Sequence, residues 1–211
     1  MSKNNEPAAA GTVTVSGVGE VQVKPDVAWI RLGVLTNAKT AREASADNAA
    51  RMSALIERMK QLGIPEKKLQ TGGLSVSPVF QYAEVPEKGQ IIGYTAENYL
   101  TVRCAVDTAG AIFDEGMAAG ATQSSSLSFG LQDDAEHADA ALEEAVKAAR
   151  HKAKVVAAAL GVRLGAPLSV EVVQGGRVGL QRELAMTKEA ATPVLPGAVT
   201  VSAQVTIVFA C

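Results

Sequence analysis

The sequence predicts an α+β protein in which long, mostly antiparallel strands are covered by two long helices. Residues 199–209 alternate strictly between apolar and polar side chains, which is typical of a strand with one buried and one solvent-facing side. Residues 40–62 and 133–160 instead repeat apolar side chains every three or four positions, as amphipathic helices do. A length of 211 residues with 47% hydrophobic residues is enough for a substantial core.

The N-terminal part predicts a tail followed by strands. Residues 1–11 are rich in polar residues, Pro and Ala and are expected to be disordered. Two short strands, 12–17 and 21–24, are expected on either side of a turn at residues 17–20, because Gly17 and Gly19 are turn residues. Residues 27–36 form a more continuous apolar run that carries Trp29, which predicts a strand buried on both faces.

The first long helix, 40–62, is expected to end at Gly63, with Pro65 beyond it. Strands at 69–81 and 91–106 follow, then a short helix at 108–119 and a strand at 123–131. The second long helix, 133–160, begins at a sequence that resembles a capping box, Asp133 with Glu136. Its predicted buried stripe repeats every three or four residues and consists of Ala141, Leu142, Ala145, Val146, Ala149, Val156, Ala159 and Leu160.

A strand at 168–173 precedes a long loop, 174–197, and the chain closes with the alternating strand. We expect residues 12–211 to form a single domain, since no linker divides them. The sequence also contains a weak internal repeat. Leu-Gly-Ile at 62–64 and Leu-Gly-Val at 160–162 each end a long predicted helix, and two predicted strands follow each of them. Two related helix–strand–strand units would explain the repeat, and chance is the alternative.

The chemistry-bearing residues form no recognisable reactive group. The net charge is −2, without a basic run, which argues against nucleic-acid binding. His137 and His151 lie about 21 Å apart along one helix, too far to share a metal. Cys104, in a predicted strand, is interpreted as a buried structural residue rather than a reactive thiol. No catalytic, cofactor-binding or metal-binding residue is therefore predicted. No stretch reaches the roughly 20 apolar residues of a transmembrane helix.

Several segments, in order, resemble the SIMPL-domain family. They are residues 13–21 with 24–28, 41–48, 62–64, 93–98, 157–165 and 192–203. The resemblance implies an α+β fold and export to the bacterial periplasm or outer envelope. It also implies similarity to an immunodominant periplasmic antigen and to a protein associated with oxidative-stress defence. Some family members form large ring-like or channel-like homo-oligomers, and a eukaryotic relative is described as an adaptor. The N-terminus shows no signal sequence, so a cytoplasmic location is the alternative.

These observations predict a non-enzymatic cell-envelope protein that assembles with itself, without a cofactor. The candidate interface residues lie in two predicted loops, the one between the strands 69–81 and 91–106 and the one at 174–197. They are Tyr82, Leu184, Met186 and Leu195. The alternative is an adaptor module that binds a protein partner, such as another envelope protein, as a monomer or dimer. A redox role for Cys104 is a third hypothesis.

Overall fold

A computed structural model describes residues 11–81, 90–174 and 192–211. Within these residues the chain forms two compact units. Unit 1 consists of residues 11–24, 132–174 and 197–211, and unit 2 consists of residues 25–81, 90–131 and 192–196. The prediction that residues 12–211 form a single domain stays a prediction, because a division by contacts does not show whether the two units fold together. The predicted α+β class is confirmed in both units.

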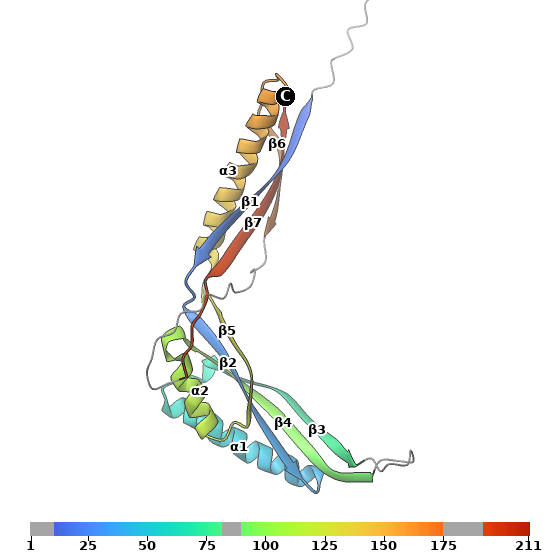
Figure 1. The fold of residues 1–211 in the computed structure, drawn as a ribbon, viewed down its shortest axis with the longest axis vertical. Helices are drawn as coiled ribbons and strands as arrows, with labels where there is room; N and C mark the ends of the chain where they lie inside the picture. Colours follow the sequence, from blue (N-terminus) through green and yellow to red (C-terminus); the bar gives the residue numbers. More distant parts are fainter. Residues whose placement is uncertain (1–10, 82–89, 175–191) are drawn as a thin grey trace, which may run out of the picture. The chain divides into compact units, whose positions relative to one another are not determined.

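Unit 1 is a three-stranded antiparallel sheet with one long helix. The strand order is β1 (Thr12–Val23), β7 (Val199–Ala210), β6 (Pro167–Gln174). Helix α3 (Ala135–Ala159) runs along β1 and β7 (Figure 1). The buried core between them consists of Val13, Ala141, Ala145, Ala149, Ala153, Ala203, Val205, Ile207 and Phe209.

The predicted turn at residues 17–20 is wrong, because β1 is continuous. It pairs with β7 residue by residue, from Thr12 opposite Ala210 to Val23 opposite Val199. The two glycines serve close packing instead. A Cβ atom at Gly17 would lie 2.0 Å from the carbonyl oxygen of Ala145, and one at Gly19 would lie 2.1 Å from that of Ala141. Glycine therefore lets the α3 backbone approach the strand closely.

The buried face of α3 is narrower than the sequence predicts. Its buried residues are alanines at every fourth position: Ala141, Ala145, Ala149, Ala153 and Ala157. Val146, Val156 and Leu160 were expected in the stripe, but they are 37%, 39% and 66% exposed. The close helix–strand approach explains this, because it leaves room only for methyl side chains at the contact.

The hydrogen bonds at the start of α3 also differ from the prediction. The helix begins after Asp134, and the carboxylate of Asp133 accepts a hydrogen bond from the backbone N–H of Ala135. The expected capping box between Asp133 and Glu136 is therefore wrong. The acidic side chain caps locally, which still satisfies one N–H of the first turn.

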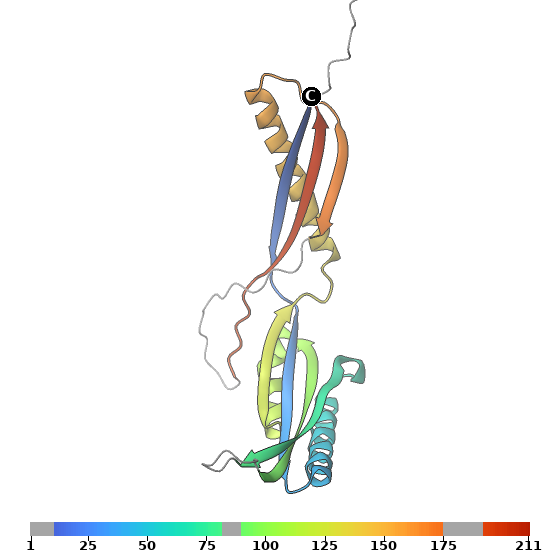
Figure 2. The same ribbon diagram turned by 90° about the vertical axis from the view of Figure 1, so that its right-hand side faces the viewer.

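Unit 2 is a four-stranded antiparallel sheet with two helices. Its strand order is β3 (Leu69–Gln81), β4 (Gln90–Ala105), β2 (Val27–Ala38), β5 (Gln123–Gly130). Helices α1 (Ala41–Gln61) and α2 (Ala109–Ala118) lie on the same side of this sheet (Figure 2). Two 3-10 turns, η1 (Glu66–Lys68) and η2 (Val106–Thr108), precede β3 and α2. The largest buried side chains of this core are Ile30, Leu32, Val34, Leu55, Met59, Leu100 and Val102.

Helix α1 is fixed at its start and at its middle. Thr40 and Glu43 form a reciprocal capping box, with both hydrogen bonds at 3.2 Å. The buried Asn48 amide donates to the carbonyl oxygens of Val34, at 2.7 Å, and of Ala96, at 3.1 Å. One helical side chain therefore ties α1 to two neighbouring strands.

Strand β2 is not buried on both faces, which corrects the prediction, and Trp29 lies on its less buried face. Its neighbours Ala28 and Ile30 are fully buried in the core, whereas Trp29 is half-buried. Its ring lies against Gly130, where a Cβ atom would come within 2.7 Å of the ring. The reason is that both helices pack on the other face of the sheet.

The predicted pair of related units is confirmed in topology. In each unit the elements follow one another in the order strand, long helix, strand, strand: β2, α1, β3, β4 in unit 2 and β1, α3, β6, β7 in unit 1. In both sheets the last of these strands lies between the other two, in the orders β3-β4-β2 and β6-β7-β1. Both helices also end alike. Gly63 and Gly161 have φ angles of 82° and 68°, and each helix closes with the same pair of backbone hydrogen bonds, a Schellman motif.

Candidate functional site

Strand β3, one of the two outer strands of the unit 2 sheet, presents an apolar edge. All of β3 except Leu69 is exposed, and the sheet order leaves its outer side without a neighbouring strand among the described residues. We call the following residues the β3 edge: Leu74, Val76, Val79 and Phe80 on β3, with Ile91 and Ile92 on β4. They are between 36% and 66% exposed. An edge of this kind is a template for pairing with another chain unless it is protected.

The corresponding strand of unit 1 has the same character. Strand β6 is at the end of its sheet, and its apolar side chains Leu168, Val170, Val172 and Val173 are 47–60% exposed. We call these four residues the β6 edge. Because β3 and β6 occupy equivalent places in the two related units, the fold presents the same feature twice.

Sequence reasoning missed both edges, although one signal pointed to them. Pro78 lies inside β3, opposite Tyr94, and β6 begins at Pro167. Proline cannot donate to a ladder of hydrogen bonds, so within a sheet it favours edge strands and strand starts. That rule would have placed β3 at the edge before the structure was known.

Of the predicted interface residues, the structure describes only Leu195. Tyr82, Leu184 and Met186 lie outside the described residues. Leu195 is 43% exposed and follows an anchored segment of unit 2. There the Asp114 carboxylate accepts hydrogen bonds from the hydroxyl of Thr192, at 2.5 Å, and from its backbone N–H, at 2.9 Å. These two bonds, the hydroxyl bond first, lower the pKa of Asp114.

A polar cluster lies on the unit 2 sheet, on the face opposite the helices. The Tyr99 hydroxyl and the Gln123 amide both donate to the Glu97 carboxylate. The Arg31 guanidinium lies 4.1 Å from the centre of the Tyr99 ring, a cation–π contact. Gly33, opposite both Tyr99 and Gln123, leaves the space in which these side chains meet.

The cluster changes the protonation of its own members. The hydrogen bonds from Tyr99 and then Gln123 hold the pKa of Glu97 below its ordinary value, and the bond to Glu97 raises the pKa of Tyr99. These bonds join β2, β4 and β5, so the arrangement crosslinks the sheet. The raised pKa of Tyr99 disfavours its phenolate, the form in which it would act as a nucleophile.

The cysteines and possible metal ligands offer little chemistry. Cys104 and Cys211 are both free, the first buried and the second exposed. Burial is the main reason that the pKa of the Cys104 thiol is raised, which disfavours the reactive thiolate. Within the described ranges, no three His, Cys, Asp or Glu side chains converge as metal ligands. Over the same ranges, none of the helices combines the length and the apolar character that spanning a membrane requires.

Comparison with known proteins gives the family. Residues 13–209 match the SIMPL family, described as a protein of unknown function (DUF541). This protein belongs to the SIMPL family. The match covers both units, so the two related units together make up one SIMPL region. The family description specifies no enzymatic activity.

Individual SIMPL relatives are bacterial. The 26 kDa periplasmic immunogenic protein of Brucella melitensis is 31% identical over 211 aligned residues, which cover 93% of this chain and 83% of the relative. The uncharacterized protein YggE of Edwardsiella ictaluri is 26% identical, over 75% of this chain and 66% of the relative. YggE of Escherichia coli K12 is also 26% identical, over 75% and 64%.

Proposed function

We propose that this protein is a non-enzymatic protein of the periplasm or cell envelope that assembles with itself into a large, ring-like or channel-like homo-oligomer. The location rests on the SIMPL family and on the name of the Brucella relative, which calls that protein periplasmic. The assembly rests on one observation, the β3 edge. Among the described residues it has no neighbouring strand on its outer side, and its apolar side chains are exposed, which together favour pairing with another copy.

The β6 edge gives the assembly a second contact. A copy with one contact surface stops at a dimer, whereas a copy with two can continue to further copies until the ring closes. The two edges lie on different units, so they are separate surfaces. This supports a closed oligomer of many subunits rather than a dimer.

The mass in solution tests the proposal, measured by size-exclusion chromatography with light scattering over a dilution series. The wild type is expected to give one discrete mass that is a multiple of 21.8 kDa and does not change on dilution. Val76→Lys on the β3 edge and Val173→Lys on the β6 edge should each reduce it to small species, because a charge on an edge strand opposes pairing.

Ala50→Lys is the matched control. It adds the same charge at an exposed position of α1, away from both edges, and should leave the mass unchanged. A wild type that is monomeric at micromolar concentration would overturn the assembly. It would favour the second candidate function, an adaptor for a protein partner that binds beside the exposed, anchored Leu195 segment.

The resemblance also implies a link to oxidative-stress defence. The raised pKa of the buried Cys104 thiol gives no support to direct chemistry with an oxidant. We therefore propose that any such role is exerted through the assembled protein and not through the Cys104 thiol.

A further inference from the structure

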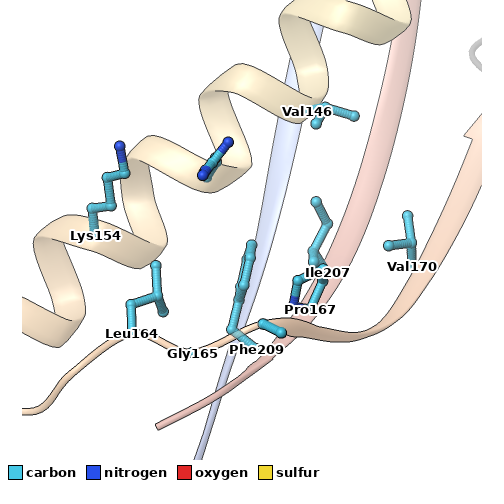
Figure 3. Close-up of a pocket in the computed structure, with 10 residues that line it drawn as sticks. Val146, Lys154, Leu164, Gly165, Pro167, Val170, Ile207 and Phe209 are labelled. Carbon is cyan, nitrogen blue, oxygen red and sulfur yellow. The ribbon is translucent and has the colours of Figure 1, made fainter.

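Unit 1 contains an apolar groove with a cationic border. It has a volume of about 500 Å³ and lies between α3, β6 and the segment before β6 (Figure 3). Its apolar residues include Ile207 and Phe209 on β7, Val170 on β6 and Val146 on α3, and Figure 3 shows their side chains gathered around one space. The volume is in the range of small-molecule sites.

The walls of the groove offer few backbone groups to a ligand. The N–H of Gly165 already donates to the carbonyl oxygen of Ala210, at 2.8 Å, and the N–H of Ala210 donates to that of Ala166, at 3.1 Å. A peptide placed here would bury amide groups against apolar side chains without partners, which is costly. The groove therefore suits a chain without polar groups along its length.

Two positively charged side chains on one face of α3 border the groove. Arg150 and Lys154 are one turn apart on α3 and both line the groove. Within the described part of the chain, neither has an ion-pair partner. By contrast, Lys147, one turn before Arg150, pairs with Glu143 and Glu144 and does not line the groove.

The surrounding sequence strengthens the positive charge. Between Glu144 and Glu171 the chain contains five Lys and Arg residues and no Asp or Glu. Such a one-signed region attracts anions. An apolar groove bordered by unpaired cations is complementary to a molecule with an apolar chain and an anionic end.

We propose that this groove binds a long-chain fatty acid, with its hydrocarbon chain over Ile207 and Phe209 and its carboxylate at Arg150 and Lys154. This goes beyond the proposed assembly, with which the groove shares one residue, Val170 of the β6 edge. Strand pairing at the β6 edge uses backbone groups in the plane of the sheet, whereas the groove lies on the face that α3 covers.

Isothermal titration of the full chain with dodecanoate tests the proposal. Dodecanoate should bind with one site per chain, and dodecanol, which has the same chain without the charge, should bind about tenfold or more weakly. The double variant Arg150→Gln/Lys154→Gln should lose a similar factor for dodecanoate and little for dodecanol. Lys147→Gln, with a charge removed elsewhere on α3, should keep the wild-type affinity.

A second variant tests the contact between the hydrocarbon chain and the apolar residues of the groove. Val170→Asp places a carboxylate at the groove on a half-exposed edge residue and should abolish dodecanoate binding, with an unchanged circular dichroism spectrum. Absence of dodecanoate binding to the wild type, or equal affinity for dodecanoate and dodecanol, would overturn the proposal. So would an affinity that falls as the protein concentration rises, because that would show a second copy covering the groove.

Discussion

At the scale of single residues, glycine decides how unit 1 packs. Gly17 and Gly19 lie on β1 where the α3 backbone comes closest. Sequence alone suggests a turn for a Gly-x-Gly, since glycine is common in turns. In β1 the small size of glycine matters and its conformational freedom does not, because neither Gly17 nor Gly19 has a positive φ.

Gly17→Ala should therefore destabilise the protein by about 1–3 kcal/mol, as an added methyl group in a tightly packed contact does. The free energy of unfolding in urea, followed by far-UV circular dichroism, measures this. Gly72→Ala is the control, because its Cβ would meet no atom within 4 Å. An equal loss in both variants would contradict the packing explanation.

The polar cluster around Glu97 predicts a dependence on pH. Its folded-state pKa lies below the ordinary value of 4.5, so the ionised carboxylate stabilises the folded state above that value. This contribution is lost as the pH falls from about 4.5 through the lower folded-state pKa. The urea midpoint of the wild type should therefore fall over this interval more than that of Glu97→Gln.

Glu20→Gln, at an exposed position of β1, is the control for that titration. Its midpoint should follow the wild type through the acid range. If Glu97→Gln also followed the wild type, the hydrogen bonds from Tyr99 and Gln123 would not stabilise the ionised carboxylate.

At the scale of elements, the sequence was informative because periodicity and caps are local. The predicted helix 40–62 corresponds to α1 at Ala41–Gln61, and the strand 69–81 corresponds to β3. The face that each element buries was harder to predict. Val156 and Leu160 have the right spacing for a core, but whether they are buried depends on how closely α3 approaches β1, which is a contact between distant segments.

The candidate site was predicted less well than the elements. An edge strand is defined by its place in the sheet order, and β3 has the same alternating pattern whether it is central or outermost. Only Pro78 carried that information locally. The groove beside α3 was not predictable either, since it combines residues from Val146 to Phe209.

The capping box of α1 gives a prediction for an element. Thr40→Ala should cost about 1 kcal/mol, because the N–H of Glu43 loses its acceptor. Glu43→Ala should cost less than this, and the double variant should cost less than the sum, since the two side chains act as one reciprocal pair. Urea unfolding of the three variants measures the coupling, and strict additivity would contradict it.

At the scale of the whole molecule, the chain passes between the units at residues 24–25, 131–132 and 196–197, and once more between residues 174 and 192. Unit 1 is thus assembled from segments that unit 2 separates in sequence. A folded unit 2 keeps these segments close, which lowers the entropy cost of bringing β1 and β7 together. We therefore propose that residues 12–211 unfold as one domain, although the cores are separate.

Trp29 makes this proposal testable, because it is the only Trp and reports on unit 2. Urea unfolding followed by Trp29 fluorescence and by far-UV circular dichroism should give the same midpoint. Leu55→Ala, in the unit 2 core, should lower both midpoints together, at a cost of about 2–5 kcal/mol. Two separate transitions in the wild type would show that each unit unfolds by itself.

The pairing of β1 with β7 also has a consequence for biosynthesis. About 175 residues lie between these strands, so a ribosome that adds roughly 5–20 residues per second needs on the order of 10 to 35 s to supply the partner. Helix α3 also follows β1 by more than 100 residues, so for most of that interval both the buried face and the edge of β1 stay open. The nascent N-terminal strand is therefore the segment whose protection by a chaperone would most improve the yield of folded protein.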